Sequence, residues 1–454
     1  MSLATINPAT GEVLQTFAAF DDAEVEERLD RAEAAFHAYR RTTFEQRARW
    51  MISAAELLEG EVPDIAEMVT TEMGKTFAAA KGEVSKCART MRWFAENASE
   101  LLADEHVSTS ATASWVRYEP LGPILAVMPW NFPLWQVVRF AAPGLMAGNV
   151  GLLKHASNVS RTALFLESLF ARAGFPPGAF QTLLVGSERV SGIVEDERIR
   201  AVTLTGSEAA GASVAAAAGR SLKKAVLELG GSDAFVVLPT ANLERAVETG
   251  AQARIQNNGQ SCIAAKRFVV HREVYDYFAE ELARVMSELT VGDPMDVATE
   301  VGPLSSERQL DEIASQVEDA RSKGASVLCG GQSGDGPGYF YRPTVIEGVE
   351  PAMRIATEEV FGPVAVLYKA DDAEDALHIA NDTPFGLGAS VWTEDVAEQE
   401  RFSSGLEVGV VSFNAMVASN PELPFGGVKR SGFGRELGAQ GIRELCSAKT
   451  VWRA

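Results

Sequence analysis

The stretch Ile124-Leu125-Ala126-Val127-Met128 decides the fold class that the sequence predicts. Five apolar residues in succession, with no polar alternation, predict a strand buried on both faces of a sheet. Similar runs recur downstream, with segments of helical composition between them, at 150–154, 180–185, 201–205 and 225–229. Strands that alternate with helices predict an α/β fold with a mostly parallel sheet and a nucleotide site at the carboxyl ends of its strands.

The flanking sequence adds a helical region before this sheet and a second α/β region after it. Between residues 22 and 102, apolar residues at spacings of three and four predict helices, which we expect Gly74 and Gly82 to interrupt. Residues 114–119 alternate in a way that predicts an exposed strand. A buried strand at 234–238 and an amphipathic helix at 242–256 begin the second α/β region.

Length and charge limit the classes of function. A chain of 454 residues, 46% of them hydrophobic, exceeds a single core and predicts two or three domains. The formal net charge of −21 argues against nucleic acid or an anionic membrane surface as a partner. The N-terminus lacks a signal-peptide pattern and no apolar run approaches the ~20 residues of a membrane span, so we expect a cytoplasmic protein. The 4 cysteines are widely spaced without a CxxC pair, which predicts reduced thiols and no metal site.

Cys262 is the first candidate for chemistry. It follows the polar turn Asn257-Asn258-Gly259-Gln260-Ser261, where the sequence changes from helical to strand character. A cysteine exposed on a turn and braced by a strand can act as a nucleophile when a neighbouring group takes its proton. The alternative is a small buried apolar side chain, which is the usual role of a free cysteine.

Two other residues have the chemistry that such a nucleophile needs. Glu228 ends an apolar strand before two glycines, where partial desolvation would raise its pKa toward that of a general base. A structural glutamate paired with a nearby lysine is an equally good interpretation. Asn131 lies between Pro129 and Pro133, which fix the backbone, so its amide could donate to an oxyanion together with the backbone N–H of Cys262. An ordinary turn asparagine is the alternative.

A candidate phosphate site follows another strand. Thr205-Gly206-Ser207 opens an alanine-rich helix, and amides at a helix N-terminus bind pyrophosphate without positive side chains. The sequence has no GxGxxG and no Walker A motif, so we expect a dinucleotide to be held in an unusual way. Lys154 ends the second strand and could reach a ribose or its phosphate. None of the 5 histidines lies in a Gly-rich turn beside a nucleophile, which favours Glu228 over histidine as the base.

Six motifs in this order resemble the aldehyde dehydrogenase superfamily over nearly the whole chain. The stretches 130–136 and 153–157 are most similar to those of bacterial succinate-semialdehyde dehydrogenases. The six motifs are Pro129-Trp130-Asn131-Phe132-Pro133, Thr205-Gly206-Ser207, Glu228-Leu229-Gly230-Gly231, Asn258-Gly259-Gln260-Ser261-Cys262, Glu358-Glu359-Val360-Phe361-Gly362-Pro363 and Pro424-Phe425-Gly426-Gly427.

The resemblance implies a role for each candidate. Cys262 would attack the aldehyde to give a thiohemiacetal, Asn131 would stabilise its oxyanion, and Glu228 would activate the water that hydrolyses the resulting thioester. It further implies that Glu359 binds the nicotinamide ribose and that Phe361 packs near the nicotinamide ring. The cofactor-binding residues implied in this way are Trp130, Lys154, Ser157, Thr205, Gly206, Ser207, Glu359 and Phe361.

Ser157 decides the expected cofactor. Relatives that prefer NAD often carry a glutamate at this position, three residues after Lys154, where it bonds the ribose 2′-hydroxyl and repels a 2′-phosphate. A neutral serine tolerates the phosphate, so we expect NADP as the cofactor, with NAD as the alternative.

The resemblance assigns the substrate site to three residues. Arg139, eight residues past Asn131 and about two helical turns along, matches the arginine that binds a substrate carboxylate; a surface arginine in an ion pair is the alternative. A second arginine of some relatives is Gln256 here, and Ser419 could supply a hydrogen bond instead. Trp135 would line the substrate tunnel.

The resemblance also implies the domain organisation. We expect a Rossmann-like cofactor-binding domain at 1–107 and 122–232, an α/β catalytic domain at 233–425, and a bridging β arm at 108–121 and 426–454. The arm would make a homodimer or homotetramer, since an exposed edge that carries aromatic residues is a liability in a monomer.

Three other functions stay open from the sequence. The substrate could be glutarate semialdehyde or a simple aliphatic aldehyde instead of succinate semialdehyde. The protein could be a cysteine hydrolase that works without NAD(P). It could also be a non-catalytic relative with a structural or binding role, although Cys262, Glu228 and Asn131 are all present.

Overall fold

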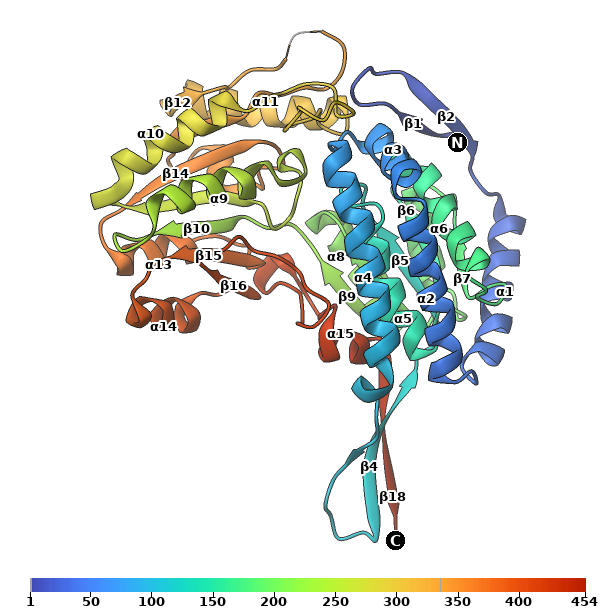
Figure 1. Ribbon diagram of the computed structural model, residues 1–454. Helices are drawn as coiled ribbons and strands as arrows, with labels where there is room; N and C mark the ends of the chain where they lie inside the picture. The colour runs from blue at the N-terminus through green and yellow to red at the C-terminus, as the bar shows by residue number, and fades with distance from the viewer. Residues whose placement is uncertain (1, 335) are drawn as a thin grey trace.

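The computed structural model describes residues 2–334 and 336–454. It contains two large sheets, each covered by helices, and a long two-stranded ribbon that projects away from both (Figure 1). The prediction of an α/β fold with mostly parallel sheets is confirmed. None of the helices in the described residues combines the length and apolar character needed to cross a membrane.

The first sheet has six strands in the order β17-β9-β8-β5-β6-β7. β5 pairs in parallel with both β6 and β8, and only β17 runs antiparallel to its neighbour. The strands are β5 (Pro123–Met128), β6 (Val150–His155), β7 (Phe180–Thr182), β8 (Ala201–Thr205), β9 (Lys224–Glu228) and β17 (Gly432–Phe433). The helices between them are α5 (Trp135–Ala147), η1 (Ser157–Val159), α6 (Ser160–Arg172), η2 (Ser187–Arg189), α7 (Val190–Glu195) and α8 (Glu208–Arg220).

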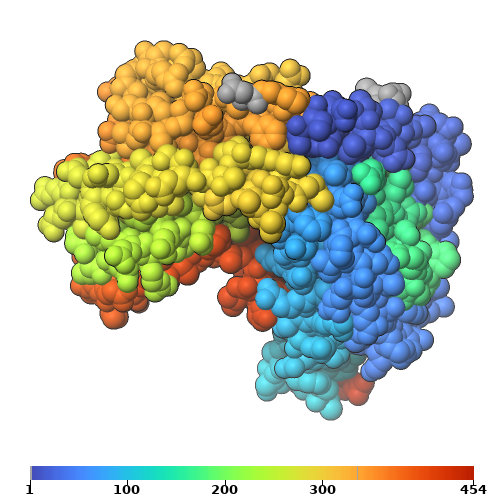
Figure 2. All heavy atoms as spheres, turned by 45° about the horizontal axis from the view of Figure 1, so that its top comes forward, coloured from blue at the N-terminus to red at the C-terminus, as the bar shows by residue number. Residues whose placement is uncertain are grey.

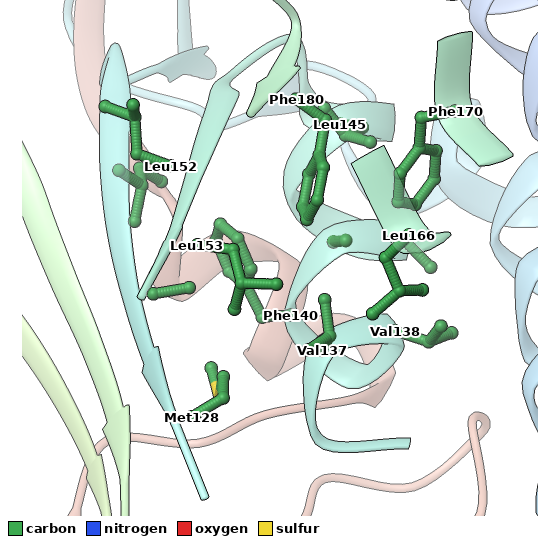
Figure 3. Close-up of a cluster of buried hydrophobic side chains, with 14 of the residues drawn as sticks. Met128, Val137, Val138, Phe140, Leu145, Leu152, Leu153, Leu166, Phe170 and Phe180 are labelled. Carbon is green, nitrogen blue, oxygen red and sulfur yellow. The ribbon is translucent and has the colours of Figure 1, made fainter. Parts of the chain in front are cut away.

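The largest hydrophobic core lies where α5 packs against this sheet (Figure 3). Every residue of α5 is buried, and Met128 from β5 and Leu152 and Leu153 from β6 belong to the same cluster. Because both faces of the central strands are covered, their sequences are continuous apolar runs. This core fixes the carboxyl ends of β5 and β8, which carry Asn131 and Ser207 in the loops that follow.

The N-terminal helices pack on the first sheet and on one another (Figure 1). Gly74 ends α3 in the left-handed conformation, as predicted for a helix break. Gly82 does not interrupt a helix, because it lies inside α4. The elements are β1 (Ser2–Ile6), β2 (Val13–Ala18), α1 (Asp22–Tyr39), α2 (Phe44–Gly60), α3 (Val62–Met73) and α4 (Phe77–Leu101).

The second large sheet has seven strands in the order β12-β13-β14-β11-β10-β15-β16, all parallel except β12. Its strands are β10 (Asp233–Val237), β11 (Ala265–His271), β12 (Ser326–Cys329), β13 (Thr344–Glu347), β14 (Val364–Ala370), β15 (Gly388–Trp392) and β16 (Val410–Phe413). Its helices are α9 (Leu243–Ile255), η3 (Gln256–Gly259), α10 (Arg272–Glu288), α11 (Glu307–Ser322), α12 (Arg354–Thr357), α13 (Ala373–Asn381) and α14 (Val396–Gly405).

The projecting ribbon belongs to a third sheet in the order β18-β4-β3. β4 (Ala113–Pro120) is the exposed strand that the alternating sequence predicts, and β18 (Cys446–Arg453) is longer than expected from residues 450–452. The remaining elements of this part of the chain are β3 (Glu105–His106), η4 (Lys429–Ser431) and α15 (Gly438–Glu444). Glu105–His106 pairs with β4 in this sheet, and Gly432–Phe433 pairs with β9 in the six-stranded sheet.

Candidate active site

The turn before Cys262 is held in an unusual backbone conformation. Asn257 and Asn258 have φ of 56° and 58°, in the left-handed region that asparagine tolerates better than most residues. Their side chains hold the turn in place: Nδ2 of Asn257 donates to the carbonyl oxygen of Asn131 at 2.7 Å, and Nδ2 of Asn258 donates to that of Pro303 at 3.0 Å. A Cβ on Gly259 would meet the carbonyl carbon of Gly362 at 2.3 Å. The turn is therefore fixed from several sides, and Cys262 with it.

A buried lysine supports Cys262 from behind. Lys266, the second residue of β11, is 0% exposed, and its Nζ donates to the carbonyl oxygens of Ser261 at 2.9 Å and Cys262 at 2.7 Å. The same Nζ lies 3.3 Å from a carboxylate oxygen of Glu359. Sequence reasoning missed Lys266; the available signal was a lysine at the start of a predicted strand, four residues past the cysteine.

Cys262 lies between two cavities and lines both of them. The first cavity, of about 230 Å³, also contains Asn131, Glu359 and the turn between β8 and α8. The second cavity, of about 250 Å³, contains Trp135, Arg139 and Ser419. The space-filling view shows the surface hollowed between α9 and α10, in lime and yellow, and α4, in light blue (Figure 2). The sulfur of Cys262 can therefore contact a ligand in either of the two cavities.

The first cavity has the features of a dinucleotide site. Thr205, Gly206 and Ser207 line it, and Ser207 caps α8 by accepting a hydrogen bond from the backbone of Ala210. A Cβ on Gly206 would meet only Leu204, at 3.7 Å, so the space before the helix N-terminus is open to an anion. The rings of Trp130 and Phe361 also line this cavity and meet edge to face with centroids 5.8 Å apart.

Two predicted cofactor residues lie outside the lining of this cavity. Lys154 is at the end of β6, where burial lowers its pKa and the charge of Glu188 raises it again. Ser157 is exposed and begins η1. Lys154 lies on the strand next to β5 and Ser157 follows that strand, at the carboxyl end of the sheet, which is where the adenosine end of a dinucleotide lies in such folds.

Asn131 is positioned to donate to an anion beside the sulfur. It is 4% exposed and lines the first cavity with Cys262. Nδ2 donates one hydrogen to the carbonyl oxygen of Gln260 at 3.1 Å. An amide nitrogen carries two hydrogens, so one stays available for a ligand oxygen.

Glu228 is buried and its pKa lies well above the usual range. Desolvation is the main cause; Arg139 opposes the shift and Glu436 adds to it. Neither carboxylate oxygen has a hydrogen-bond partner in the described residues, and a Cβ on Gly426 would lie 2.6 Å from Oε1. Glu228 lines neither cavity at Cys262, so its carboxylate must turn toward the sulfur in order to act there.

The thiol of Cys262 does not ionise readily in this environment. Burial raises its pKa to about 12, while the charges of Arg139 and Lys266 act in the opposite direction. A thiol with such a pKa is almost entirely protonated near neutral pH, and a protonated thiol is a weak nucleophile. Attack on a ligand therefore requires a base or an added positive charge in the site.

The second cavity contains all three predicted substrate residues and two that sequence reasoning missed. Trp135, Arg139 and Ser419 are buried side chains in its wall. Lys86 from α4 joins them: its Nζ donates to Oγ of Ser419 at 2.8 Å and lies 4.0 Å from the ring centroid of Trp135. Gln136 lines both cavities. Gln136 ends the recognised stretch 130–136, whereas no local motif marks Lys86, because its importance depends on contacts with distant parts of the chain.

The structure places Arg139 in a buried ion pair. Its Nε contacts the carboxylate of Glu436, and its Nη2 donates to Oγ1 of Thr205 at 3.2 Å. Its guanidinium also lies over the ring of Phe425, with 4.9 Å between the guanidinium carbon and the ring centroid. The sequence-based expectation treats Arg139 as a free cation for a substrate carboxylate, whereas Glu436 already balances its charge.

Comparison with known proteins identifies the group to which this site belongs. A model described as the aldehyde dehydrogenase family matches residues 1–451. A protein of Mycobacterium tuberculosis (strain ATCC 25618 / H37Rv), named succinate-semialdehyde dehydrogenase NADP(+) 1, is 58% identical over 457 residues, covering 100% of both chains. The crystal structure of succinic semialdehyde dehydrogenase from Streptococcus pyogenes in complex with NADP+ matches with a TM-score of 0.97 and 37% identity over 99% of each chain. The structure of Gox0499, solved to study its cofactor and substrate selection, matches with a TM-score of 0.98 and 40% identity over 100% of both chains.

Proposed function

The chain belongs to the aldehyde dehydrogenase family, and on that premise we propose that it oxidises succinate semialdehyde to succinate with NADP+ as the cofactor. The observation that carries the proposal is the position of Cys262 between two cavities, one suited to a dinucleotide and one lined by cationic and hydroxyl side chains. Full-length relatives named for this activity at 57–58% identity support the choice of substrate and cofactor.

Cys262 carries the covalent chemistry in this mechanism. Its sulfur forms a bond to the aldehyde carbon, and the thiol proton passes to a water molecule in the site, with the charges of Arg139 and Lys266 favouring its release. The new oxyanion accepts hydrogen bonds from the free hydrogen of Asn131 Nδ2 and from the backbone N–H of Cys262. The bound nicotinamide supplies the hydride acceptor for the oxidation, which leaves a thioester on Cys262.

Glu228 completes the cycle. Burial raises its pKa above the usual value, so its carboxylate takes a proton from water more readily than an exposed glutamate does. Water adds to the thioester carbon, the C–S bond breaks and the acid leaves. A thiolate is a good leaving group, which is one reason a cysteine suits a reaction with a covalent acyl stage.

Lys266 and Glu359 act as supports on the cofactor side. Lys266 fixes the two carbonyl groups next to the sulfur, and Glu359 also accepts from the backbone N–H of Gly231 at 3.1 Å. In the proposed complex the carboxylate of Glu359 binds the nicotinamide ribose, and Trp130 and Phe361 border the ring. Lys154 and Ser157 would contact the adenosine ribose, where a neutral serine leaves room for a 2′-phosphate.

The proposed partners include further copies of the chain. β18 is the outer strand of its sheet, most of its residues are exposed, and Trp452 is 57% exposed. We propose that this edge pairs with another subunit in a homodimer or homotetramer, because an uncovered edge of this length is prone to uncontrolled pairing. Light scattering on the purified chain would give the number of subunits, and a monomer at micromolar concentration would contradict the proposal.

A panel of aldehydes tests the function. We expect kcat/KM to be highest for succinate semialdehyde among succinate semialdehyde, glutarate semialdehyde and butanal, and higher with NADP+ than with NAD+. Formation of reduced nicotinamide is followed by its absorbance. A preference for butanal would contradict the proposed substrate, and hydrolysis of an ester without any nicotinamide requirement would favour the cysteine hydrolase.

A further inference from the structure

We propose that Lys86 supplies the positive charge that binds the carboxylate of the substrate, with the Ser419 hydroxyl as its partner. Lys86 lies in the wall of the second cavity, which Cys262 also lines. This inference rests on the proposed substrate, a short aldehyde whose other end is a carboxylate, and it identifies the residue that distinguishes that substrate from an uncharged aldehyde.

The charges in the second cavity single out Lys86. Three ionisable side chains besides Cys262 line this cavity: Glu83, Lys86 and Arg139. Arg139 is paired with Glu436. Glu83 is paired with Lys75, and its Oε1 accepts from the backbone N–H groups of Leu134 and Trp135 at 2.8 and 2.9 Å. Within residues 2–334 and 336–454, Lys86 has no carboxylate partner.

Lys86 and Ser419 can both donate to one carboxylate. An ammonium group has three hydrogens and no acceptor, so Lys86 is the donor in its 2.8 Å contact with Ser419 Oγ. The hydroxyl hydrogen of Ser419 is then free to point at a ligand, and two hydrogens of Lys86 stay free. Because Nζ also lies 4.0 Å from the ring centroid of Trp135, the ammonium is held at a fixed position rather than on a freely moving side chain.

One face of α4 forms this wall of the cavity. Ala79, Gly82, Glu83 and Lys86 all line it, at the spacings of three and four that place residues on one side of a helix. Figure 1 shows α4 on the side of its helical layer that faces the seven-stranded sheet. A Cβ on Gly82 would meet no heavy atom within 4 Å. Packing therefore does not require this glycine, and its effect is to keep the cavity open one turn before Lys86.

The environment of Lys86 makes the assignment testable by pH. The pKa of Lys86 is lowered to about 8, mainly by burial and also by the charges of Arg139 from α5 and Arg89 from its own helix, while Cys87 and Glu83 act in the opposite direction. The ammonium that binds a carboxylate is therefore present below about pH 8 and is lost above it. Cys262, in the same cavity, keeps its proton over this range, because its pKa is about 12.

The decisive quantity is the ratio of kcat/KM for succinate semialdehyde to kcat/KM for butanal, measured with NADP+. We expect Lys86→Met to lower this ratio about 10- to 100-fold, the usual value of a hydrogen bond to a charged group. The conservative variant Lys86→Arg should keep most of the wild-type ratio. Lys81→Met, which removes an exposed lysine of the same helix that lines neither cavity, should leave the ratio unchanged.

The wild-type enzyme and Lys86→Arg provide a second test that does not depend on a neutral variant folding. In the wild type the ratio should fall about tenfold per pH unit above about pH 8, whereas arginine keeps its charge and should abolish this fall. An unchanged ratio in Lys86→Met, or an identical pH profile in Lys86→Arg, would overturn the assignment. If the ratio fell in Arg139→Met and did not fall in Lys86→Met, the substrate carboxylate would be bound by Arg139 and not by Lys86. If the wild type itself shows no preference for succinate semialdehyde, the proposed function fails and not only the role of Lys86.

Discussion

Arg139 and Glu436 form an ion pair in which both side chains are almost completely buried, at 2% and 6% exposure. The pair lies beside Glu228, since the charges of both residues act on the pKa of that carboxylate. Removing one partner of a buried pair leaves an uncompensated charge, which is the costly way to break it. Arg139 therefore supports the site as well as lining the second cavity.

We expect Arg139→Ala to destabilise the fold by about 3–5 kcal/mol and to lower kcat for charged and uncharged aldehydes alike. The reason is that Glu436 loses its cation and the pKa of Glu228 rises further. Urea unfolding and steady-state kinetics with succinate semialdehyde and butanal would measure both effects. The double variant Arg139→Ala with Glu436→Gln should recover part of the stability. A rise in KM confined to succinate semialdehyde would support the sequence-based role of Arg139 instead.

Glu228→Gln should raise the stability of the folded protein at high pH. Burial raises the folded-state pKa of Glu228 above its unfolded value, so its stabilising contribution is complete below about pH 4 and is lost as the pH rises through the folded pKa. Glutamine cannot ionise and escapes this loss. We expect the gain in the free energy of unfolding to be larger near pH 8 than near pH 4.5, measured by calorimetry at both values. Equal effects at both pH values would show that ionisation of Glu228 is not coupled to folding.

Gly82→Leu should stabilise α4 and impair substrate binding at the same time. A leucine in place of a glycine inside a helix gains up to about 1 kcal/mol, but at this position it would project into the second cavity. We expect a higher Tm and a higher KM for every aldehyde. Gly219→Leu is the matched control, because Gly219 is an exposed residue of α8 with open space around it and lines neither cavity. A normal KM in Gly82→Leu would contradict the assignment of this face to the substrate.

Ser157→Glu should reverse the cofactor preference. A glutamate at the start of η1 would repel a 2′-phosphate and could accept a hydrogen bond from a 2′-hydroxyl. We expect the ratio of kcat/KM with NADP+ to that with NAD+ to fall about 100-fold, with the aldehyde KM little changed. Ser85→Glu, at an exposed position of α4, controls for the added charge. A ratio that stays constant would place the 2′-phosphate elsewhere.

The sequence predicted the parallel strands of the first sheet well, because these strands are buried on both faces and appear as continuous apolar runs. It was wrong at Gly82, which was expected to interrupt a helix. A glycine ends a helix when the backbone turns left-handed there, as at Gly74, whereas Gly82 keeps a helical conformation and serves the cavity. Local pattern does not distinguish these two cases.

Residues of the site were predictable from the sequence where a single local motif contains them. They were not predictable where a function depends on two residues that are far apart in the chain. Cys262 and Asn131 stand in recognisable stretches and lie together in the structure. Lys86 and Ser419 are 333 residues apart in the chain, and only folding brings their side chains into contact. The same holds for Arg139 and Glu436. Their ion pair balances the positive charge of Arg139, which the sequence-based expectation had assigned to a substrate carboxylate.

The most direct test of the central claim is the mass of the acyl-enzyme in Glu228→Gln. Without its base the enzyme should form the thioester on Cys262 but hydrolyse it slowly, so mixing with NADP+ and succinate semialdehyde should release one burst of reduced nicotinamide per active site. Mass spectrometry of the quenched protein should then show one added succinyl group, located on Cys262 and absent from Glu228→Gln, Cys262→Ser. Continued production of reduced nicotinamide with no succinyl group on Cys262, or a succinyl group that forms without NADP+, would contradict the account.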